Sequence, residues 1–361
     1  MGLSIEQLNI RRTSEEQEES LSPFAARSAR SQGRLRPEEP CPIRTDYQRD
    51  RDRIIYSKAF RRLKHKTQVF INPQGDHYVT RLTHTLEVSQ IARTLARALN
   101  LNEDLAEAIS LGHDLGHTPF GHVGEDVLND LYPGGFRHNE QSLRTVDLLE
   151  KDGRGLNLTY EVRDGILHHS KSTASVLENW NKIGTLEAEI VRISDLIAYI
   201  NHDIVDAVRA GIITESDLPQ AAREVLGNTH SARVNTMVGD IIVNSWDIRT
   251  GETDSPAITM SERVRKAADI LREFLFEKVY NMDSANEEVA AARETVRFLY
   301  AYFNENEDEM PPEYRSPAGA TEERGAGLYG EEAARRVVDY IAGMTDQYAA
   351  GKAAEIGLRG R

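Results

Sequence analysis

Cysteine is the residue that the sequence lacks most clearly, since Cys41 is the only one in 361 residues. A single cysteine excludes an intrachain disulfide, which is usual for proteins of a reducing compartment. The N-terminal residues also lack the apolar segment of a secretory signal. No run approaches the roughly eighteen apolar residues that a membrane span needs. These absences predict a cytoplasmic protein with no membrane partner.

Basic residues are too few to balance the acidic ones: 44 Lys and Arg stand against 58 Asp and Glu, for a net charge of −14. This balance disfavours binding to nucleic acid through its phosphates, so a nucleic-acid partner stays open without being favoured. One segment is nevertheless densely basic, and it could either neutralise a triphosphate or pair with the surplus carboxylates. Its members are Arg49, Arg51, Arg53, Arg61, Arg62, Lys64 and Lys66.

The chain also lacks an internal repeat and a P-loop, because the stretch 153–155 is too short and irregular to cradle a phosphate. Strand signals are confined to residues 67–80, where two short runs flank residues 72–76 and predict at most one small β-hairpin. Elsewhere the apolar residues recur with helical spacing. The predicted fold is therefore all-α, with enough length for one large or two smaller domains.

Longer segments with a helical pattern occupy much of the chain. They are residues 78–99, 186–208, 261–280, 286–303 and 331–348. Residues 305–330 are rich in Glu, Pro and Gly and should form an exposed loop. Residues 1–46 mix an acidic run with scattered arginines and four prolines. We expect a mostly irregular arm that wraps the body or a neighbouring subunit, with disorder as the alternative.

The most polar stretch, residues 113–125, contains three histidines and two carboxylates. Buried polar groups cost free energy unless they have partners, so this concentration indicates a site rather than ordinary packing. A helix should begin at Asn102 and end near His113 and Asp114, whose side chains could face one cation. The bend that follows should return two further imidazoles to the same point. It is built from Gly116, Pro119 and Gly121, and the imidazoles are His117 and His122.

Two other helices can supply further ligands to this cation. Arg81 and His84 extend the inward stripe of the 78–99 helix. Asp195 begins a polar stripe on the 186–208 helix, and a buried aspartate there needs a partner such as a cation. The rest of that stripe is Tyr199, His202 or Asp203, and Asp206. Imidazole and carboxylate ligands together suit Mn, Fe, Co, Ni or Zn, whereas Mg is less favoured by imidazole.

The order of these motifs, H, then HD, then D, resembles that of the HD-domain metal phosphohydrolases. A longer set of motifs is similar to the deoxyguanosinetriphosphate triphosphohydrolase-like family over about residues 45–215. That set is residues 59–69 (AFRRLKHKTQV), 80–85 (TRLTHT), 113–122 (HDLGHTPFGH) and 138–142 (HNEQS). The resemblance implies an HD-domain helical bundle with additional C-terminal helices. It divides the chain into an N-terminal arm (1–46), an HD phosphohydrolase core (47–215) and a C-terminal helical region packed on the core (216–361).

The resemblance also implies a reaction, in which a deoxynucleoside triphosphate, dGTP or another, is hydrolysed at the α-phosphorus to deoxynucleoside and triphosphate. One divalent ion per site is implied, with His84, His113, Asp114 and Asp195 as its ligands. The implied catalytic residues are His122, Glu125 and His117. Glu125 would orient His122, which would donate a proton to the leaving oxygen. The implied substrate contacts are Gln68, Val69, Arg81, His138, Tyr199 and Asp203, with His117 and His138 at the phosphates.

Two other functions stay open at this point. One is another HD phosphohydrolase, such as a 5′-nucleotidase or a phosphodiesterase for a signalling nucleotide. The other is a nucleotide-sensing or nucleic-acid-binding protein with vestigial catalysis. The resemblance further implies a homo-oligomer, a tetramer or a hexamer, and leaves open a regulatory nucleotide, the base preference and the physiological metal. For His168 and His169 a surface or helix-capping role is expected.

Overall fold

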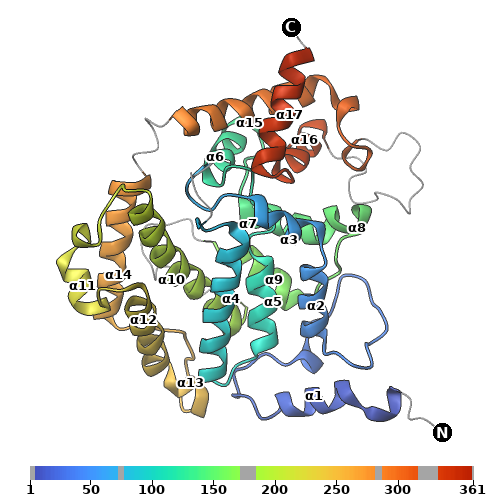
Figure 1. The fold of residues 1–361 in the computed structure, drawn as a ribbon. Helices are drawn as coiled ribbons and strands as arrows, with labels where there is room; N and C mark the ends of the chain where they lie inside the picture. Colours follow the sequence, from blue (N-terminus) through green and yellow to red (C-terminus); the bar gives the residue numbers. More distant parts are fainter. Residues whose placement is uncertain (1–4, 72–76, 171–183, 281–286, 316–331, 360–361) are drawn as a thin grey trace. The chain divides into compact units, whose positions relative to one another are not determined.

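The computed structural model describes residues 5–71, 77–170, 184–280, 287–315 and 332–359. In these ranges every named element is a helix (Figure 1), which confirms the predicted all-α fold. Within the same ranges, no helix combines the length and the apolar character that crossing a membrane requires. The chain forms two compact units, each assembled from three separate segments.

Unit 1 consists of Met1–Arg53, His84–Gly112 and Leu158–Asn281. Its long helix α10 (Leu186–Arg209) packs against α5, α9, α12 and α14, and Figure 1 shows α12 and α14 beside it. The predicted apolar stripe of α4 is buried, including Val88, Ile91 and Leu95. The other helices are α1 (Ile10–Glu18), α2 (Asp46–Ile55), α4 (Arg81–Ala98), α5 (Glu103–Gly112), α9 (Tyr160–His168), α11 (Gln220–Leu226), α12 (His230–Asn244), α13 (Trp246–Thr250) and α14 (Glu262–Leu275).

Unit 2 consists of Ile54–Thr83, His113–Asn157 and Met282–Arg361. Its helices are α3 (Lys58–Arg62), α6 (His122–Leu131), α7 (His138–Arg144), α8 (Glu150–Gly153), α15 (Glu287–Glu305), α16 (Ala333–Ala342) and α17 (Asp346–Arg359). The described residues also contain two π-helical turns. Thr145–Leu149 follows α7 in unit 2, and Phe276–Tyr280 follows α14 in unit 1.

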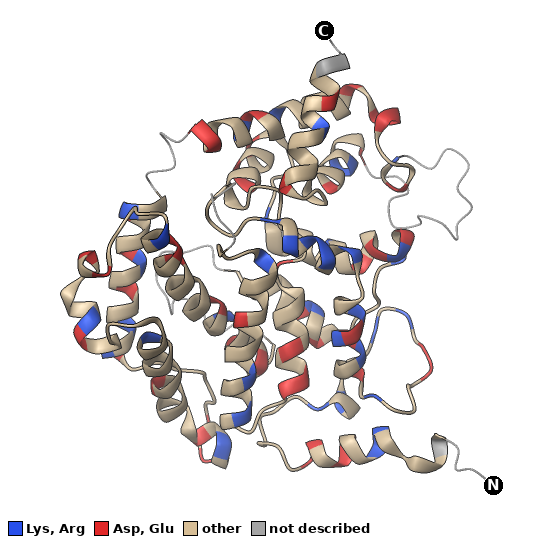
Figure 2. Ribbon diagram, in the orientation of Figure 1, with Lys and Arg blue, Asp and Glu red and all other residues tan. Residues whose placement is uncertain are grey.

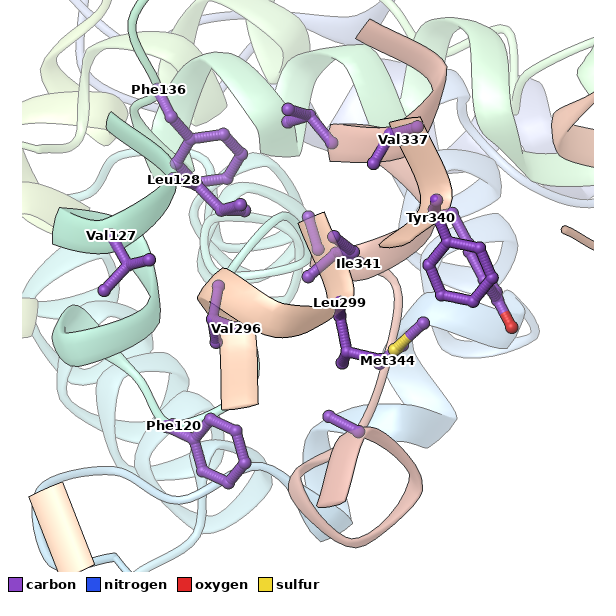
Figure 3. Close-up of a cluster of buried hydrophobic side chains, with 14 of the residues drawn as sticks. Phe120, Val127, Leu128, Phe136, Val296, Leu299, Val337, Tyr340, Ile341 and Met344 are labelled. Carbon is purple, nitrogen blue, oxygen red and sulfur yellow. The ribbon is translucent and has the colours of Figure 1, made fainter. Parts of the chain in front are cut away.

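The apolar core of unit 2 joins α6 to the C-terminal helices. Figure 3 shows Phe120 and Val127 in the same cluster as Val296 and Leu299 of α15 and Ile341 of α16. Each such side chain stabilises the unit by about 1.5–3 kcal/mol when it is fully buried. Because Phe120 lies inside the stretch 113–125, this core holds that polar turn against the C-terminal part of the chain.

The N-terminal arm differs from its prediction, because it contains a regular helix, α1 (Ile10–Glu18). Buried carboxylates hold the rest of the arm, one within the arm itself and one on α9. Glu18 accepts hydrogen bonds from the backbone N–H and hydroxyl of Ser28, at 2.7 and 2.8 Å. Glu161 accepts from the backbone N–H of Gln32 at 2.8 Å. The arm therefore packs on the body of its own chain, which is one of the two arrangements predicted for it.

Two other sequence predictions are corrected by the structure. The stretch predicted as one helix over residues 331–348 is two helices, α16 and α17, because Gly343 ends the first and Thr345 begins the second by accepting from the backbone N–H of Tyr348. The predicted hairpin is reduced, among described residues, to one isolated antiparallel bridge between Thr67 and Thr80. The turn at 72–76 lies outside the described residues, as does the 316–330 part of the predicted loop.

The densely basic segment resolves in part into ion pairs. Figure 2 shows Lys and Arg interspersed with Asp and Glu around α2. Arg49 and Arg53 both pair with Glu38, and Arg51 pairs with Glu107. For these three arginines the interpretation as salt bridges to surplus carboxylates is confirmed.

Candidate active site

The turn between α5 and α6 has a shape that its sequence enforces. Asn102 caps α5, since its Oδ1 accepts from the backbone N–H of Leu105 at 3.1 Å, and the helix ends at Gly112 as predicted. Gly116 packs so tightly on α7 that a Cβ there would lie 2.1 Å from the backbone nitrogen of Ser142. Gly121 has a φ of +58°, which side chains other than hydrogen rarely allow. These two glycines fix the bend that the sequence predicted.

In unit 2 the bend brings four polar side chains together. His117, His122, Glu125 and His138 each offer one ligand or proton-transfer atom, and these atoms all lie within 4.8 Å of one another. Nδ1 of His122 and Nδ1 of His138 each lie 2.9 Å from a Glu125 oxygen. The imidazoles of His117 and His138 are stacked with their centroids 4.1 Å apart. Of the four side chains only that of His122 is largely exposed, at 72%.

The charges in this cluster follow from burial and from these contacts. Burial would raise the pKa of Glu125, but the hydrogen bonds from His122 and His138 dominate and lower it, so the carboxylate is ionised. Burial would lower the pKa of His138, but the Glu125 carboxylate raises it. Burial, with the nearby Arg81 charge, holds the pKa of His117 well below its ordinary value. At neutral pH the cluster thus contains an ionised Glu125 and a neutral His117.

Arg81 supplies a positive charge next to this cluster. Its Nη1 donates to Oδ2 of Asp114 at 2.7 Å, and both side chains are buried. Its Nε and Nη2 are buried and have no hydrogen-bond partner among the described residues. Nδ1 of His117 is likewise buried and has no hydrogen-bond partner among the described residues. Buried donors without partners are costly, so these atoms are suited to an anionic ligand that supplies the missing acceptors.

The other oxygen of Asp114 faces two imidazoles. Oδ1 lies 3.5 Å from Nε2 of His113 and 3.7 Å from Nε2 of His117. The Arg81 contact therefore orients the carboxylate so that one oxygen is presented to the histidines. His113 and Asp114 were predicted as adjacent metal ligands. The 3.5 Å between their two atoms places both on the same side of the turn.

The turn is also held from the C-terminal helices by contacts of Lys66 and Asp346 that the sequence did not predict. The buried Nζ of Lys66 donates to the carbonyl oxygens of His117 and of Ala342, the latter at 2.7 Å. Asp346, at the start of α17, accepts from the backbone N–H groups of Phe120 and Thr67, each at 2.9 Å. No signal in the sequence could pair residues so far apart, although Lys66 belongs to the basic segment that was noted.

In unit 1, α4 and α10 bring a second set of predicted residues together. Nε2 of His84 lies 3.1 Å from Oδ1 of Asp195, whose side chain is 25% exposed. Nδ1 of His84 lies 2.9 Å from Nε2 of His202. The sequence pattern allows either His202 or Asp203 as the next member of the polar stripe. His202 is the one whose ring contacts His84. Oδ2 of Asp203 accepts from the hydroxyl of Tyr280, whereas its Oδ1 lies 2.7 Å from Nδ1 of His202 without the geometry of a hydrogen bond.

The remaining predicted residues have the following places. Tyr199 lies on the same α10 face, and burial raises the pKa of its hydroxyl. Gln68 lies against the turn at 113–125, since a Cβ at Gly121 would be 3.3 Å from its carbonyl oxygen, and its neighbour Val69 is half-buried. His168 pairs with Asp164 at 3.0 Å, whereas His169 is buried with Nδ1 2.7 Å from the carbonyl oxygen of Ile166.

The donor atoms in both units fit a divalent cation. Ligand bonds of about 2.0–2.2 Å place two ligand atoms on one ion roughly 3 Å apart, close to the 3.1 Å between His84 Nε2 and Asp195 Oδ1. In unit 2, His113 and Asp114 present the same pair of atom types. Imidazole nitrogen with carboxylate oxygen is a donor set for divalent first-row metals.

Comparison with known proteins agrees with this chemistry. Residues 81–200 match the HD domain, and residues 258–355 match the phosphohydrolase-associated domain. A protein of Caldanaerobacter subterraneus subsp. tengcongensis, named deoxyguanosinetriphosphate triphosphohydrolase-like protein, is 56% identical over 97% of this chain and 96% of its own length. The chain belongs to the deoxyguanosinetriphosphate triphosphohydrolase-like family.

Other members of the family are nearly as similar. The protein of the same name from Desulfatibacillum aliphaticivorans is 49% identical over 95% of this chain and 96% of its own length. The one from Clostridium perfringens strain SM101 is 52% identical over 91% of each chain. As a deoxyguanosinetriphosphate triphosphohydrolase-like protein with an HD domain, the chain is a hydrolase of the phosphohydrolase class, and HD domains bind divalent metals.

Proposed function

We propose that this protein hydrolyses deoxynucleoside triphosphates, dGTP among them, at the α-phosphorus to give a deoxynucleoside and inorganic triphosphate. The observation that carries the proposal is the unit 2 cluster. There an exposed imidazole, His122, is backed by an ionised carboxylate, Glu125, and lies beside the buried donors of Arg81 and His117. The relatives' printed names support the choice of substrate.

The proposal includes one divalent ion held by His84, His113, Asp114 and Asp195, the ligands that the family resemblance implies. Mn, Fe, Co, Ni and Zn suit these ligands, and Mg is the least favoured by imidazole. When bound, such an ion neutralises charge on phosphoryl oxygens and lowers the pKa of a water toward neutrality. Arg81 serves this set directly, because its contact with Asp114 fixes which oxygen faces the histidines.

The triphosphate would lie against the cationic and donor side of unit 2. Arg81 has Nε and Nη2 available within the described part of the chain, and a guanidinium is suited to phosphate oxygens. His138, whose pKa is raised by Glu125, adds positive charge, and His117 offers Nδ1. Together these residues would bind and orient the phosphates before the bond is broken.

His122 would act as the general acid. As a water oxygen adds to the α-phosphorus, the bond from phosphorus to O5′ breaks and its electron pair goes to O5′. A deoxyribose alkoxide is a poor leaving group, so it needs a proton, which His122 would deliver from Nε2. Glu125 holds Nδ1 of His122 at 2.9 Å and stabilises the positive charge on the imidazolium before the transfer.

Four residues would contact the sugar, by the same resemblance. Tyr199 would press its ring on C2′ and leave no space for a 2′-hydroxyl, which gives a steric reason for preferring deoxy substrates. Asp203 would accept from the 3′-hydroxyl, while Gln68 and Val69 would contact the sugar from the segment beside Gly121. We also propose a homo-oligomer, a tetramer or a hexamer, that acts in the cytoplasm.

The product of the reaction tests this proposal. Protein mixed with Mn²⁺ and each of the four dNTPs in turn should release deoxynucleoside and inorganic triphosphate in equal amounts. Pairs of dNTPs would then reveal activation by a regulatory nucleotide. Pyrophosphate or a nucleoside monophosphate as the first product would refute the proposal and favour another HD phosphohydrolase. Binding without turnover would favour a nucleotide sensor.

A further inference from the structure

His122, Glu125 and His138, to which the proposed function gives proton transfer and phosphate binding, also have the arrangement of three ligands around one metal ion. Oε2 of Glu125 lies 2.9 Å from Nδ1 of His122 and 3.0 Å from Nδ1 of His138. Oε1 lies 2.9 Å from the same nitrogen of His138. One carboxylate oxygen is therefore close to two imidazole nitrogens, which come from different helices, α6 and α7.

These separations fit a tetrahedral ion. Bonds of about 2.0–2.2 Å to one such ion place its ligand atoms roughly 3.4 Å apart and the centres of two imidazole rings roughly 5 Å apart. The rings of His122 and His138 have centroids 5.9 Å apart, with an angle of 71° between their planes. A small approach of the exposed His122 ring closes the difference, so both rings can direct Nδ1 at an ion beside the carboxylate.

His117 belongs to the same cluster, but its ring cannot share this ion. It is stacked on His138 with centroids 4.1 Å apart and 14° between the two planes. A ring nitrogen binds a metal in the plane of its ring, and two stacked rings cannot both direct a nitrogen at one point. His117 therefore supports the orientation of His138, and the ligands are two histidines and one glutamate. With water in the fourth position, this is an established zinc set.

The glutamate is ionised and oriented before any ion binds. The backbone N–H of His138 donates to Oε1 of Glu125 at 2.8 Å, so the carboxylate keeps its place without either imidazole. Its pKa is lowered by the hydrogen bonds from His122 and His138, so no proton has to leave it. The charge of Arg81, which would oppose a cation, is paired with Asp114 at 2.7 Å. The exposed side chain of His122 leaves the ligands open to an ion from solution.

We propose that His122, Glu125 and His138 form a second metal site, which prefers Zn²⁺ to Mn²⁺, and that zinc bound there inhibits hydrolysis. Zinc favours four ligands and imidazole nitrogen, and it binds such sites more tightly than manganese does. On Nδ1 of His122 it replaces the proton that makes the imidazole cationic, so Nε2–H is too weak an acid to protonate O5′. The zinc site is independent of the reaction, whereas the inhibition rests on the proposed function, in which His122 is the general acid.

Zinc content tests the site in Asp195→Ala, which lacks a ligand of the first ion. The metal-free variant is dialysed with Zn²⁺, and its zinc content is scaled to the folded fraction from circular dichroism. Adding Glu125→Gln should lower the content by one ion per folded chain. Adding His138→Phe, whose ring keeps the stacking, should do the same, whereas His65→Phe, which removes an exposed histidine, should not. Zinc content that neither Glu125→Gln nor His138→Phe lowers would overturn the proposal.

A second measurement uses the parent protein and so does not depend on the folding of a variant. In ¹⁵N-histidine spectra recorded with excess Zn²⁺, His122 and His138 should each have metal on Nδ1 and a proton on Nε2. Spectra in which both residues keep their zinc-free signals would refute the site, as would ligation through Nε2.

Inhibition is measured by single-turnover kinetics on the Mn²⁺-loaded parent protein, with manganese content determined in the same samples. Zinc should slow the chemical step by about 10²- to 10⁴-fold, the usual contribution of a general acid, while manganese stays bound. It should not slow His122→Ala further. Loss of manganese, or equal slowing of His122→Ala, would contradict inhibition through this site.

The two proposals fail separately. If dGTP gives triphosphate but Glu125→Gln does not lower the zinc content, this inference fails while the proposed function stands. If the zinc content falls as expected but a nucleoside monophosphate is the product, the zinc site stands while the proposed function fails.

Discussion

Replacing Glu187 with glutamine should remove part of the pH dependence of stability. Glu187 lies near the start of α10 and is completely buried. Its Oε1 accepts from the backbone N–H groups of Ala26, in the arm, and Asn102, the cap of α5, at 3.0 and 2.9 Å. Its Oε2 is buried without a hydrogen-bond partner among the described residues. The carboxylate thus joins the N-terminal arm to the helices of unit 1 with an incomplete set of partners.

The magnitude follows from the pKa. Burial raises the pKa of Glu187 from 4.5 to about 7, although three backbone N–H groups act in the opposite direction. The folded state therefore keeps this proton to a higher pH than the unfolded state does. The resulting stabilisation is complete below pH 4.5 and is lost as the pH rises through 7. With about 1.4 kcal/mol for each pKa unit, the loss amounts to roughly 3 kcal/mol.

The assay is urea unfolding of the parent protein and of Glu187→Gln at pH 5 and at pH 8. The free energy of unfolding of the parent should fall between these pH values by about 2–3 kcal/mol more than that of the variant. Other carboxylates contribute equally to both proteins and cancel in this comparison. Glu39→Gln, which changes an exposed carboxylate of the same arm, should follow the parent. A constant difference between parent and Glu187→Gln would refute the reasoning.

Three further substitutions test the roles of site residues. His122→Ala should retain its metal but slow the chemical step by about 10²- to 10⁴-fold, the usual contribution of a general acid; single-turnover kinetics measures this, and loss of the metal would contradict the assignment. Asp195→Ala should abolish activity together with metal content, which elemental analysis checks. Asp346→Asn should loosen the turn at Phe120 and lower kcat by about tenfold with metal content unchanged, since a hydrogen bond to a charged group contributes about 1.5–3 kcal/mol. The exposed control Asp308→Asn should leave kcat as it is, and equal rates for both variants would show that the anchor does not matter.

Local signals in the sequence were sufficient for the helices that carry the site. The cap at Asn102, the breaks at Gly116 and Gly121, and the inward stripe that begins with Arg81 all act over a few residues, and each has the structure that its pattern predicts. Within unit 2 these local elements suffice to bring His122 next to Glu125, because both lie in the first turn of α6.

What the sequence could not provide are contacts between distant residues. Lys66 links the turn to Ala342, 276 residues further along, and Asp346 accepts from Phe120 across 226 residues. No periodic pattern encodes such pairings. His202 could not be separated from Asp203 on the polar stripe until the position of His84 was known. The helix α1, in contrast, has a local signal in the sequence, since Arg11 and Glu15 have the i,i+4 spacing of an ion pair that stabilises helices, and they form that pair.

Hydrolysis in ¹⁸O-labelled water tests the central claim most directly. The account predicts attack at the α-phosphorus and cleavage of the bond to O5′. One ¹⁸O should therefore appear in the inorganic triphosphate released from dGTP, and none in the deoxyguanosine. Label in the deoxyguanosine, or in a nucleoside monophosphate or pyrophosphate released instead, would contradict it.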